Sequence, residues 1–198
     1  MKKLSVLFVI SILFFTASAH AAGLSAQDKK DLTRIENYMN AMPPTHAEFI
    51  QETSDGKTYE GEFWIKRPGR LRFEYKNPSH NFVVADGLFI HFWDAKMKEA
   101  SDAPIGQTLA DFILKDKVTF DDTVKVTRVV RHDGLLEVTL VQSADPGSGD
   151  LTLVFENAPL ELRAWHVKDA TGRVSKVSLM NETTGHFDPE LFIFKQPN

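Results

Sequence analysis

The chain has 198 residues, a formal net charge of −4 and no cysteine. The lack of cysteine excludes a disulfide framework and an acylated cysteine, so we expect a fold that depends on its hydrophobic core. The net acidic charge argues against a nucleic-acid-binding protein.

The start of the chain has the pattern of a cleaved secretory signal peptide over residues 1–21. Two lysines precede an apolar run at 4–15, and Ala-His-Ala at 19–21 fits a cleavage site. The apolar run is too short for a comfortable membrane span. The sequence therefore predicts an exported, soluble chain with a single domain over residues 22–198.

An amphipathic helix is expected where this domain begins. Ser25 followed by Asp28 resembles a capping box. Leu32, Ile35 and Met39 then recur at the spacing of one helix face, until two consecutive prolines end the helix.

Most of the remaining chain has the pattern of short β-strands separated by turn residues such as Asp-Gly and Pro-Gly. The expected strands lie at 46–53, 58–66, 70–76, 80–85, 88–93, 123–131, 135–142, 151–156, 161–168 and 173–182. About ten strands joined by short turns predict a large antiparallel sheet, which must curl or close.

The hairpin at 61–75 has the clearest alternation of apolar and polar residues. Phe63 and Ile65 share one face of its first strand, and Leu71, Phe73 and Tyr75 share one face of its second strand.

Arg67 has the same parity as the apolar face of that first strand, at the strand's end. This cation is therefore expected at the rim of an apolar surface. A solvated arginine at a strand end is the alternative, because arginine is mostly exposed in proteins.

One mid-chain segment interrupts the strand pattern. Ile105, Leu109, Phe112 and Ile113 recur at i, i+4, i+7 and i+8, which predicts a helix entered by Pro104. We expect this helix and the first one to cover the concave face of the sheet. Ordinary core packing is the alternative for each of these residues.

No group of side chains indicates an active site. The histidines are scattered without metal-ligand spacing, and the sequence contains neither a nucleophile elbow nor a glycine-rich phosphate loop after a strand. We therefore expect no enzyme activity, no cofactor and no metal.

A series of motifs then follows one order along the chain. These motifs are AEFIQ at 47–51, GEFWIKRP at 61–68, LRFEY at 71–75, VVADG at 83–87 and F-x-F-x-x-P at 192–197. Together they resemble the periplasmic outer-membrane lipoprotein carrier family, LolA. In this comparison the last motif resembles the closing strand of the family, and residues 104–114 lie at the position of its lid helix.

The resemblance implies a mainly β (α+β) fold, namely an incomplete, strongly curved antiparallel β-barrel with helices forming a lid over an apolar cavity. It implies a periplasmic carrier, expected as a monomer, that shields the acyl chains of lipoproteins and moves them from the inner to the outer membrane. The implied partners are acylated lipoproteins, an ATP-driven inner-membrane release complex and an outer-membrane acceptor. A lipid-binding or lipoprotein-sensing module on the same scaffold is the alternative.

Parity and resemblance together give the predicted site. The predicted lipid-binding residues are Phe63, Ile65, Leu71, Phe73, Tyr75, Leu109, Phe112 and Ile113. Arg67 matches the functional arginine of the family, and we expect its guanidinium to hold the lid by donating hydrogen bonds to carbonyl groups at a helix end.

Overall fold

The computed structural model describes residues 23–76, 78–106 and 109–197, so the expected signal peptide lies outside the described residues. In the part that is described, eleven strands form a single antiparallel sheet in the order β6-β5-β4-β3-β2-β1-β11-β10-β9-β8-β7. The elements are α1 (Ala26–Ala41), β1 (Thr45–Thr53), β2 (Thr58–Lys66), β3 (Arg70–Tyr75), β4 (Phe82–Asp86), β5 (Phe89–Asp94), β6 (Glu99–Pro104), the 3-10 helix η1 (Leu109–Leu114), β7 (Val124–His132), β8 (Leu135–Gln142), the 3-10 helix η2 (Pro146–Ser148), β9 (Gly149–Asn157), β10 (Leu160–Asp169), β11 (Val174–Thr184) and the 3-10 helix η3 (Pro189–Phe192).

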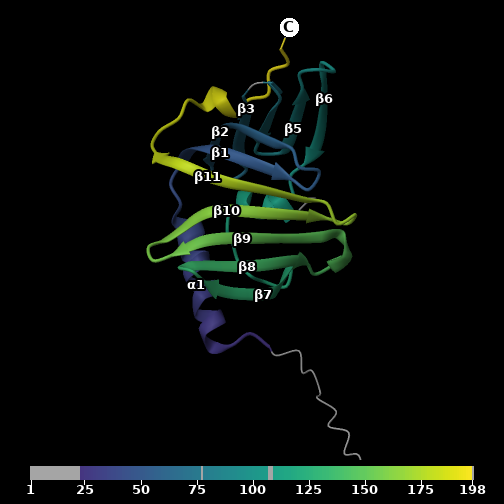
Figure 1. Ribbon diagram of the computed structural model, residues 1–198. Helices are drawn as coiled ribbons and strands as arrows, with labels where there is room; N and C mark the ends of the chain where they lie inside the picture. The colour runs from purple at the N-terminus through teal and green to yellow at the C-terminus, as the bar shows by residue number, and fades with distance from the viewer. Residues whose placement is uncertain (1–22, 77, 107–108, 198) are drawn as a thin grey trace, which may run out of the picture.

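The sheet curls strongly but does not close, because β6 and β7 are its two edges. Figure 1 shows β7 to β11 running across the view, whereas β5 and β6 stand upright at the top. Strand β1 pairs with both β2 and β11, so the first and last strands meet at the centre. Among the described residues, no helix is both long and apolar enough to span a membrane.

The core fills the concave side of the sheet, where α1 and η1 pack against strands from both halves. Leu32, Ile35 and Met39 of α1 are buried, as the spacing predicts. The predicted capping box is confirmed: the Asp28 amide donates to Ser25 Oγ at 3.1 Å, and the Ser25 amide donates to Asp28 Oδ2 at 2.9 Å. This reciprocal pair fixes where the helix begins.

A buried carboxylate fastens α1 to the β7 edge of the sheet. Asp31 is 1% exposed, and its Oδ1 accepts from Arg34 Nη1 at 2.7 Å. Its Oδ2 accepts from Arg131 Nε of β7 at 2.7 Å. Arg34 also donates from Nη2 to the backbone oxygen of Asn157, at the β9–β10 turn, at 2.9 Å. The amino-terminal half of α1 is thus held by ion pairs.

The α-helix expected from Pro104 is wrong in type and extent. Pro104 is the last residue of β6 and lies opposite Phe89, and the helix is a 3-10 helix that begins at Leu109. The hydrogen bond from the Ile105 amide to the Leu88 oxygen, at 2.9 Å, extends the β5–β6 hairpin. Strand β6 was not expected, because its sequence EASDAP is poor in β-forming residues, although a proline is tolerated in an edge strand.

The carboxyl-terminal segment also differs from the expected closing strand. It forms η3, whose first turn is capped by Asp188, and Phe192 is buried. Phe194 stacks on His91 with ring centroids 4.8 Å apart, and Arg72 Nη1 donates to the Leu191 oxygen at 3.1 Å. Side chains of β3, β4 and β5 thus contact this segment.

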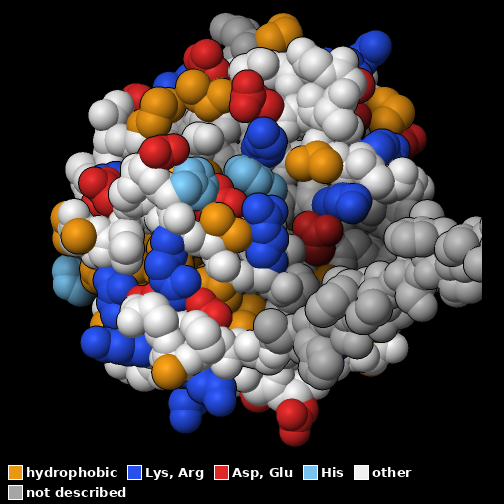
Figure 2. Space-filling view, turned by 60° about the horizontal axis from the view of Figure 1, so that its bottom comes forward, with side chains coloured by type: hydrophobic (Ala, Val, Ile, Leu, Met, Phe, Trp, Pro, Cys, Tyr) orange, Lys and Arg blue, Asp and Glu red, His pale blue; other side chains and the backbone are white. Residues whose placement is uncertain are grey.

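The surface carries charges of both signs close together. Figure 2 shows one face on which basic, acidic and hydrophobic side chains are interspersed. This arrangement agrees with a net charge of only −4.

Candidate functional site

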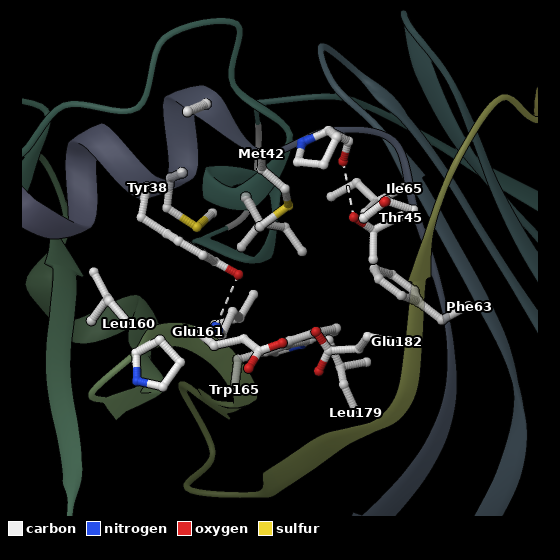
Figure 3. A pocket seen from close by; sticks show the side chains of 17 residues that line it. Tyr38, Met42, Thr45, Phe63, Ile65, Leu160, Glu161, Trp165, Leu179 and Glu182 are labelled. Carbon is white, nitrogen blue, oxygen red and sulfur yellow. Dashed lines mark hydrogen bonds between the residues drawn. The ribbon is translucent and has the colours of Figure 1, made fainter.

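An apolar pocket with a volume of about 480 Å³ opens beside the carboxyl-terminal end of α1. Its walls come from α1, β1, β2, η1, the β9–β10 turn, β10 and β11, and Figure 3 shows the side chains that face it. The lining residues are Tyr38, Met39, Ala41, Met42, Pro43, Thr45, Phe63, Ile65, Ile113, Pro159, Leu160, Glu161, Leu162, Trp165, Leu179, Glu182 and Thr184.

The strand register explains why these walls are apolar. Phe63 lies opposite Ala47, and Ile65 lies opposite Thr45, so the β1–β2 pair presents small residues beside large ones. On the other wall, the ladder between β9 and β10 shifts between Leu162 and Ala164. Because of this bulge, Leu162 and Trp165 both reach the pocket although they are three positions apart.

Tyr38 joins α1 to the bulged strand. Its hydroxyl oxygen accepts a hydrogen bond from the Leu162 amide at 3.1 Å, as Figure 3 shows. Burial raises the pKa of this phenol, while the hydrogen bond from Leu162 opposes the rise. The helix side chain thus gives a hydrogen-bond partner to a backbone amide beside the bulge.

Three of the predicted lipid-binding residues line this pocket, namely Phe63, Ile65 and Ile113. Leu109 and Phe112 line a second pocket of about 310 Å³ on the other side of η1, together with Val124 and Gln142 among others. The short helix therefore contributes to two pockets. No contact with a lipid tests these five residues, and their binding role stays a prediction.

The other three predicted residues lie in the neighbouring core. Leu71 is buried, and the rings of Phe73 and Tyr75 pack on Phe49 at centroid distances of 4.9 Å and 5.2 Å. Tyr75 also donates to Gln51 Oε1 at 2.6 Å, and burial raises the pKa of Tyr75 to about 12. These three residues are absent from the linings of both pockets above, since aromatic packing with β1 occupies this part of the concave face.

The guanidinium of Arg67 lies where α1 and η1 both end. Its Nε donates to the backbone oxygen of Lys115 at 3.1 Å, and its Nη2 donates to that of Asp116 at 3.3 Å. Its Nη1 donates to the backbone oxygen of Met39 in α1. Burial lowers the pKa of Arg67, an effect that Asp116 opposes, but an arginine remains charged at neutral pH.

Further hydrogen bonds reinforce the same junction. The Gly69 amide in the β2–β3 turn donates to the Leu114 oxygen at 2.9 Å. Asn40 of α1 pairs with the backbone of Val118, donating to its oxygen at 2.9 Å and accepting from its amide at 2.8 Å. We call α1, η1 and residues 115–120 the cover of the concave face. Hydrogen bonds join the parts of the cover to one another and to the β2–β3 turn.

Sequence reasoning missed the carboxylates of the pocket, Glu161 and Glu182. Burial raises the pKa of Glu182 and the charge of Glu161 raises it further, while Arg163 counteracts both. Alternation places Glu161 on the face of β10 opposite Leu160 and Leu162. The ladder between β1 and β11 shifts beside Glu182, between Met180 and Thr183, so alternation does not assign that residue either.

The model of the family described as outer membrane lipoprotein carrier protein LolA matches residues 42–195. The chain belongs to the LolA family. An outer-membrane lipoprotein carrier protein of Methylococcus capsulatus is 22% identical over 174 residues, which cover 83% of each chain. One from Nitrosospira multiformis is 26% identical over 216 residues, covering 98% of this chain and 96% of that protein.

Solved structures also resemble this LolA-family chain. A conserved protein of Thermus thermophilus superposes with a TM-score of 0.50 at 11% identity, covering 83% of this chain and 91% of that one. A LolA superfamily protein of Nitrosomonas europaea has a TM-score of 0.49 at 10% identity, covering 82% and 97%. The first of these likenesses shows a shared fold.

Proposed function

We propose that this LolA-family chain is a periplasmic carrier that shields the acyl chains of lipoproteins and moves them from the inner to the outer membrane. The observation that carries the proposal is the apolar pocket between the end of α1 and strands β2, β10 and β11. The family membership and the named carriers among the relatives support the same role.

The energetics favour a carrier of this kind. Each buried methylene contributes about 0.8 kcal/mol, so three acyl chains of about fifteen methylenes each would cost roughly 36 kcal/mol to expose to water. An apolar pocket offsets this cost without recognising the sequence of the attached protein, which suits a carrier of many cargoes.

The pocket must enlarge to hold several chains, and the cover is the part that we propose to move. A volume of about 480 Å³ lies in the lower half of the 300–1,000 Å³ range typical of single small-ligand pockets. Movement of α1 away from β10 would join the space beneath it to the pocket behind η1. In this proposal Arg67 holds the closed form, and cargo must break its hydrogen bonds on entry.

The two partners follow from the direction of transport. We propose that the chain receives cargo from an ATP-driven inner-membrane release complex and gives it to an outer-membrane acceptor. The predicted signal peptide at residues 1–21 supports export to the periplasm.

The test is release of newly made lipoproteins from spheroplasts, the cells from which the outer membrane has been removed. Purified protein should bring labelled lipoproteins into the supernatant. Leu160→Glu, which puts a charge in the pocket lining, should abolish this release. The matched control Leu88→Glu changes a side chain that is 73% exposed and should release lipoproteins normally. Equal release by the two variants would contradict the proposed pocket.

A further inference from the structure

The pocket behind η1 combines apolar walls with one cation. Its volume is about 310 Å³, and it lies between η1, the start of β7 and the end of β8. The described residues of its lining include neither aspartate nor glutamate. The lining residues are Ile105, Gly106, Leu109, Phe112, Lys115, Thr123, Val124, Gln142 and Ala144.

The polar side chains of this lining gather in one part of the pocket. Lys115 Nζ donates a hydrogen bond to Thr123 Oγ1 at 3.1 Å. Thr123 directly precedes β7, whose first residue, Val124, lies opposite Gln142 of β8. These polar groups thus lie where β7 begins and β8 ends, whereas η1 supplies apolar side chains. The pocket is therefore amphipathic, with a basic end and an apolar wall.

The ammonium group of Lys115 retains donors for a ligand. It lies 5.4 Å from the centroid of the Phe112 ring, and of its three donors Thr123 takes one. Among the residues that the structure describes, no carboxylate forms an ion pair with Lys115. The neighbouring carboxylate of Asp121 accepts instead from the hydroxyls of Thr123 and Thr119, at 2.6 Å and 2.7 Å, within its own turn.

We propose that this pocket binds one fatty acid, with the carboxylate at Lys115 and the chain between η1 and β7. The carboxyl group of a fatty acid resembles that of glutamate, whose pKa is about 4.3, so it is ionised at neutral pH. The ammonium group complements this charge, and the pocket contains no acidic side chain that would repel it. The volume lies near the lower limit of small-ligand pockets, which suits a single chain.

This ligand differs from the proposed cargo, because it has one chain and carries its own negative charge. The pocket is present while the hydrogen bonds of Arg67 hold the cover closed, so a fatty acid needs no movement of α1. In the proposed function the same space joins the cargo pocket when the cover moves. A bound fatty acid would therefore compete with lipoprotein, but its binding does not depend on lipoprotein transport.

The first test compares decanoate, decanol and butyrate by isothermal titration calorimetry at pH 7, below the concentration at which decanoate forms micelles. We expect decanoate to bind about tenfold more tightly than decanol, because it adds a charged hydrogen bond. Butyrate lacks six methylenes and should bind at least about a hundredfold more weakly than decanoate. Added salt should reduce the preference for decanoate over decanol.

The variant Lys115→Gln should remove the preference for decanoate and keep the affinity for decanol. Its control, Lys125→Gln, makes the same change in net charge at an exposed side chain of β7 and should behave as the wild-type protein does. An equal loss of preference in the two variants would overturn the assignment to Lys115.

The second test locates the ligand. Ala144→Trp puts a large ring at an exposed position of the lining and should weaken decanoate binding at least about tenfold. Ala170→Trp, in the exposed β10–β11 turn, is its control. Leu160→Glu changes the pocket beside α1 and should keep the preference for decanoate.

The outcomes separate this site from the proposed function. Equal affinities of the wild-type protein for decanoate and decanol would overturn the inference, and this comparison remains decisive if Ala144→Trp does not fold. Loss of the preference in Leu160→Glu, with Ala144→Trp unaffected, would place the ligand beside α1 and also overturn it. A protein that binds decanoate as expected but releases no lipoprotein from spheroplasts would instead contradict the proposed function.

Discussion

Arg67 Nε donates a hydrogen bond to the backbone oxygen of Lys115, which directly follows η1, at 3.1 Å. The same guanidinium also donates to the backbone oxygen of Met39 near the end of α1. One side chain directly after β2 thus satisfies carbonyl groups at the ends of two helices. A rigid fork of donors suits this task better than a single ammonium group.

Replacing Arg67 by leucine should impair transfer of cargo more than loading. Each lost charged hydrogen bond removes about 1.5–3 kcal/mol from the closed cover, so loaded cargo no longer competes with closure. In a two-step assay, loaded Arg67→Leu should keep its lipoprotein when acceptor membranes are added. Arg67→Lys should be milder, because it keeps the charge, and Arg70→Leu is the exposed control on the same hairpin. Normal transfer by Arg67→Leu would leave Arg67 with a structural role alone.

Asp31→Ala should destabilise the protein by about 1–3 kcal/mol, because it removes the buried acceptor of charged hydrogen bonds from Arg34 and Arg131, whose own side chains stay partly in water. Urea unfolding measures this loss, and Asp55→Ala, at an exposed carboxylate, should change stability little.

Burial tends to raise the pKa of Asp31, but hydrogen bonds from Gln27, Arg131 and Arg34 outweigh it and lower the pKa. Ionised Asp31 therefore contributes fully to the free energy of unfolding above its unfolded pKa of about 3.9. This contribution is lost as the pH falls through the lower pKa of the folded state.

His91 should make stability depend on pH in the opposite sense. Its Nδ1 lies 2.7 Å from Asp102 Oδ1 and its Nε2 lies 3.2 Å from Asp86 Oδ2, so both nitrogens can donate only when the ring is charged. Burial lowers its pKa, but the two carboxylates outweigh burial and raise it. Protonated His91 therefore contributes fully to the free energy of unfolding below its unfolded pKa of about 6.5. This contribution is lost as the pH rises through the higher pKa of the folded state.

The measurement for His91 is urea unfolding of wild type and His91→Gln between pH 5 and pH 9. The difference in stability should be about 1–2 kcal/mol at the acidic end and should shrink above neutrality. Asp102→Asn should reproduce part of that change. A difference that stays constant across the range would show that His91 contributes by packing on Phe194.

Gly61→Ala should destabilise the protein at strand β2, where this glycine lies between β1 and β3. A Cβ at this position would lie 2.0 Å from the Glu74 oxygen and 2.5 Å from the Phe49 ring, so backbone and core would both have to shift. Overpacking of this kind costs about 1–3 kcal/mol. Gly185→Ala is the control, because a Cβ there meets nothing within 4 Å. A thermal melt in which both variants match wild type would mean that the hairpin is free to move.

The alternation in the first hairpin predicted much of the fold. Phe63 lies opposite Phe73 and Ile65 lies opposite Leu71, so parity in β2 and β3 gave the correct inward face. Parity could not show which inward residues meet a pocket and which meet other side chains. Phe73 packs on Phe49 and Trp165, and these contacts depend on strands far away in the sequence.

Two local features limited the prediction elsewhere. The spacing of Ile105, Leu109, Phe112 and Ile113 fits one helix face, but the first of these residues ends an edge hairpin and the others lie in a 3-10 helix. The bulge in β10 shifts the parity of the side chains that follow it, so Trp165 could not be assigned to the pocket from alternation. Bulges and edge strands depend on neighbours that a local pattern does not contain.

Entry of acyl chains into the pocket beside α1 can be measured directly, because one of the three tryptophans lines it. One variant keeps only Trp165, with Trp64→Phe and Trp93→Phe, and a second keeps only Trp64. Each is loaded with a lipopeptide whose acyl chains carry bromine, which quenches tryptophan fluorescence on contact. The account predicts strong quenching of Trp165 and little quenching of Trp64. Equal quenching of both, or none of Trp165 in protein that carries the lipopeptide, would contradict it.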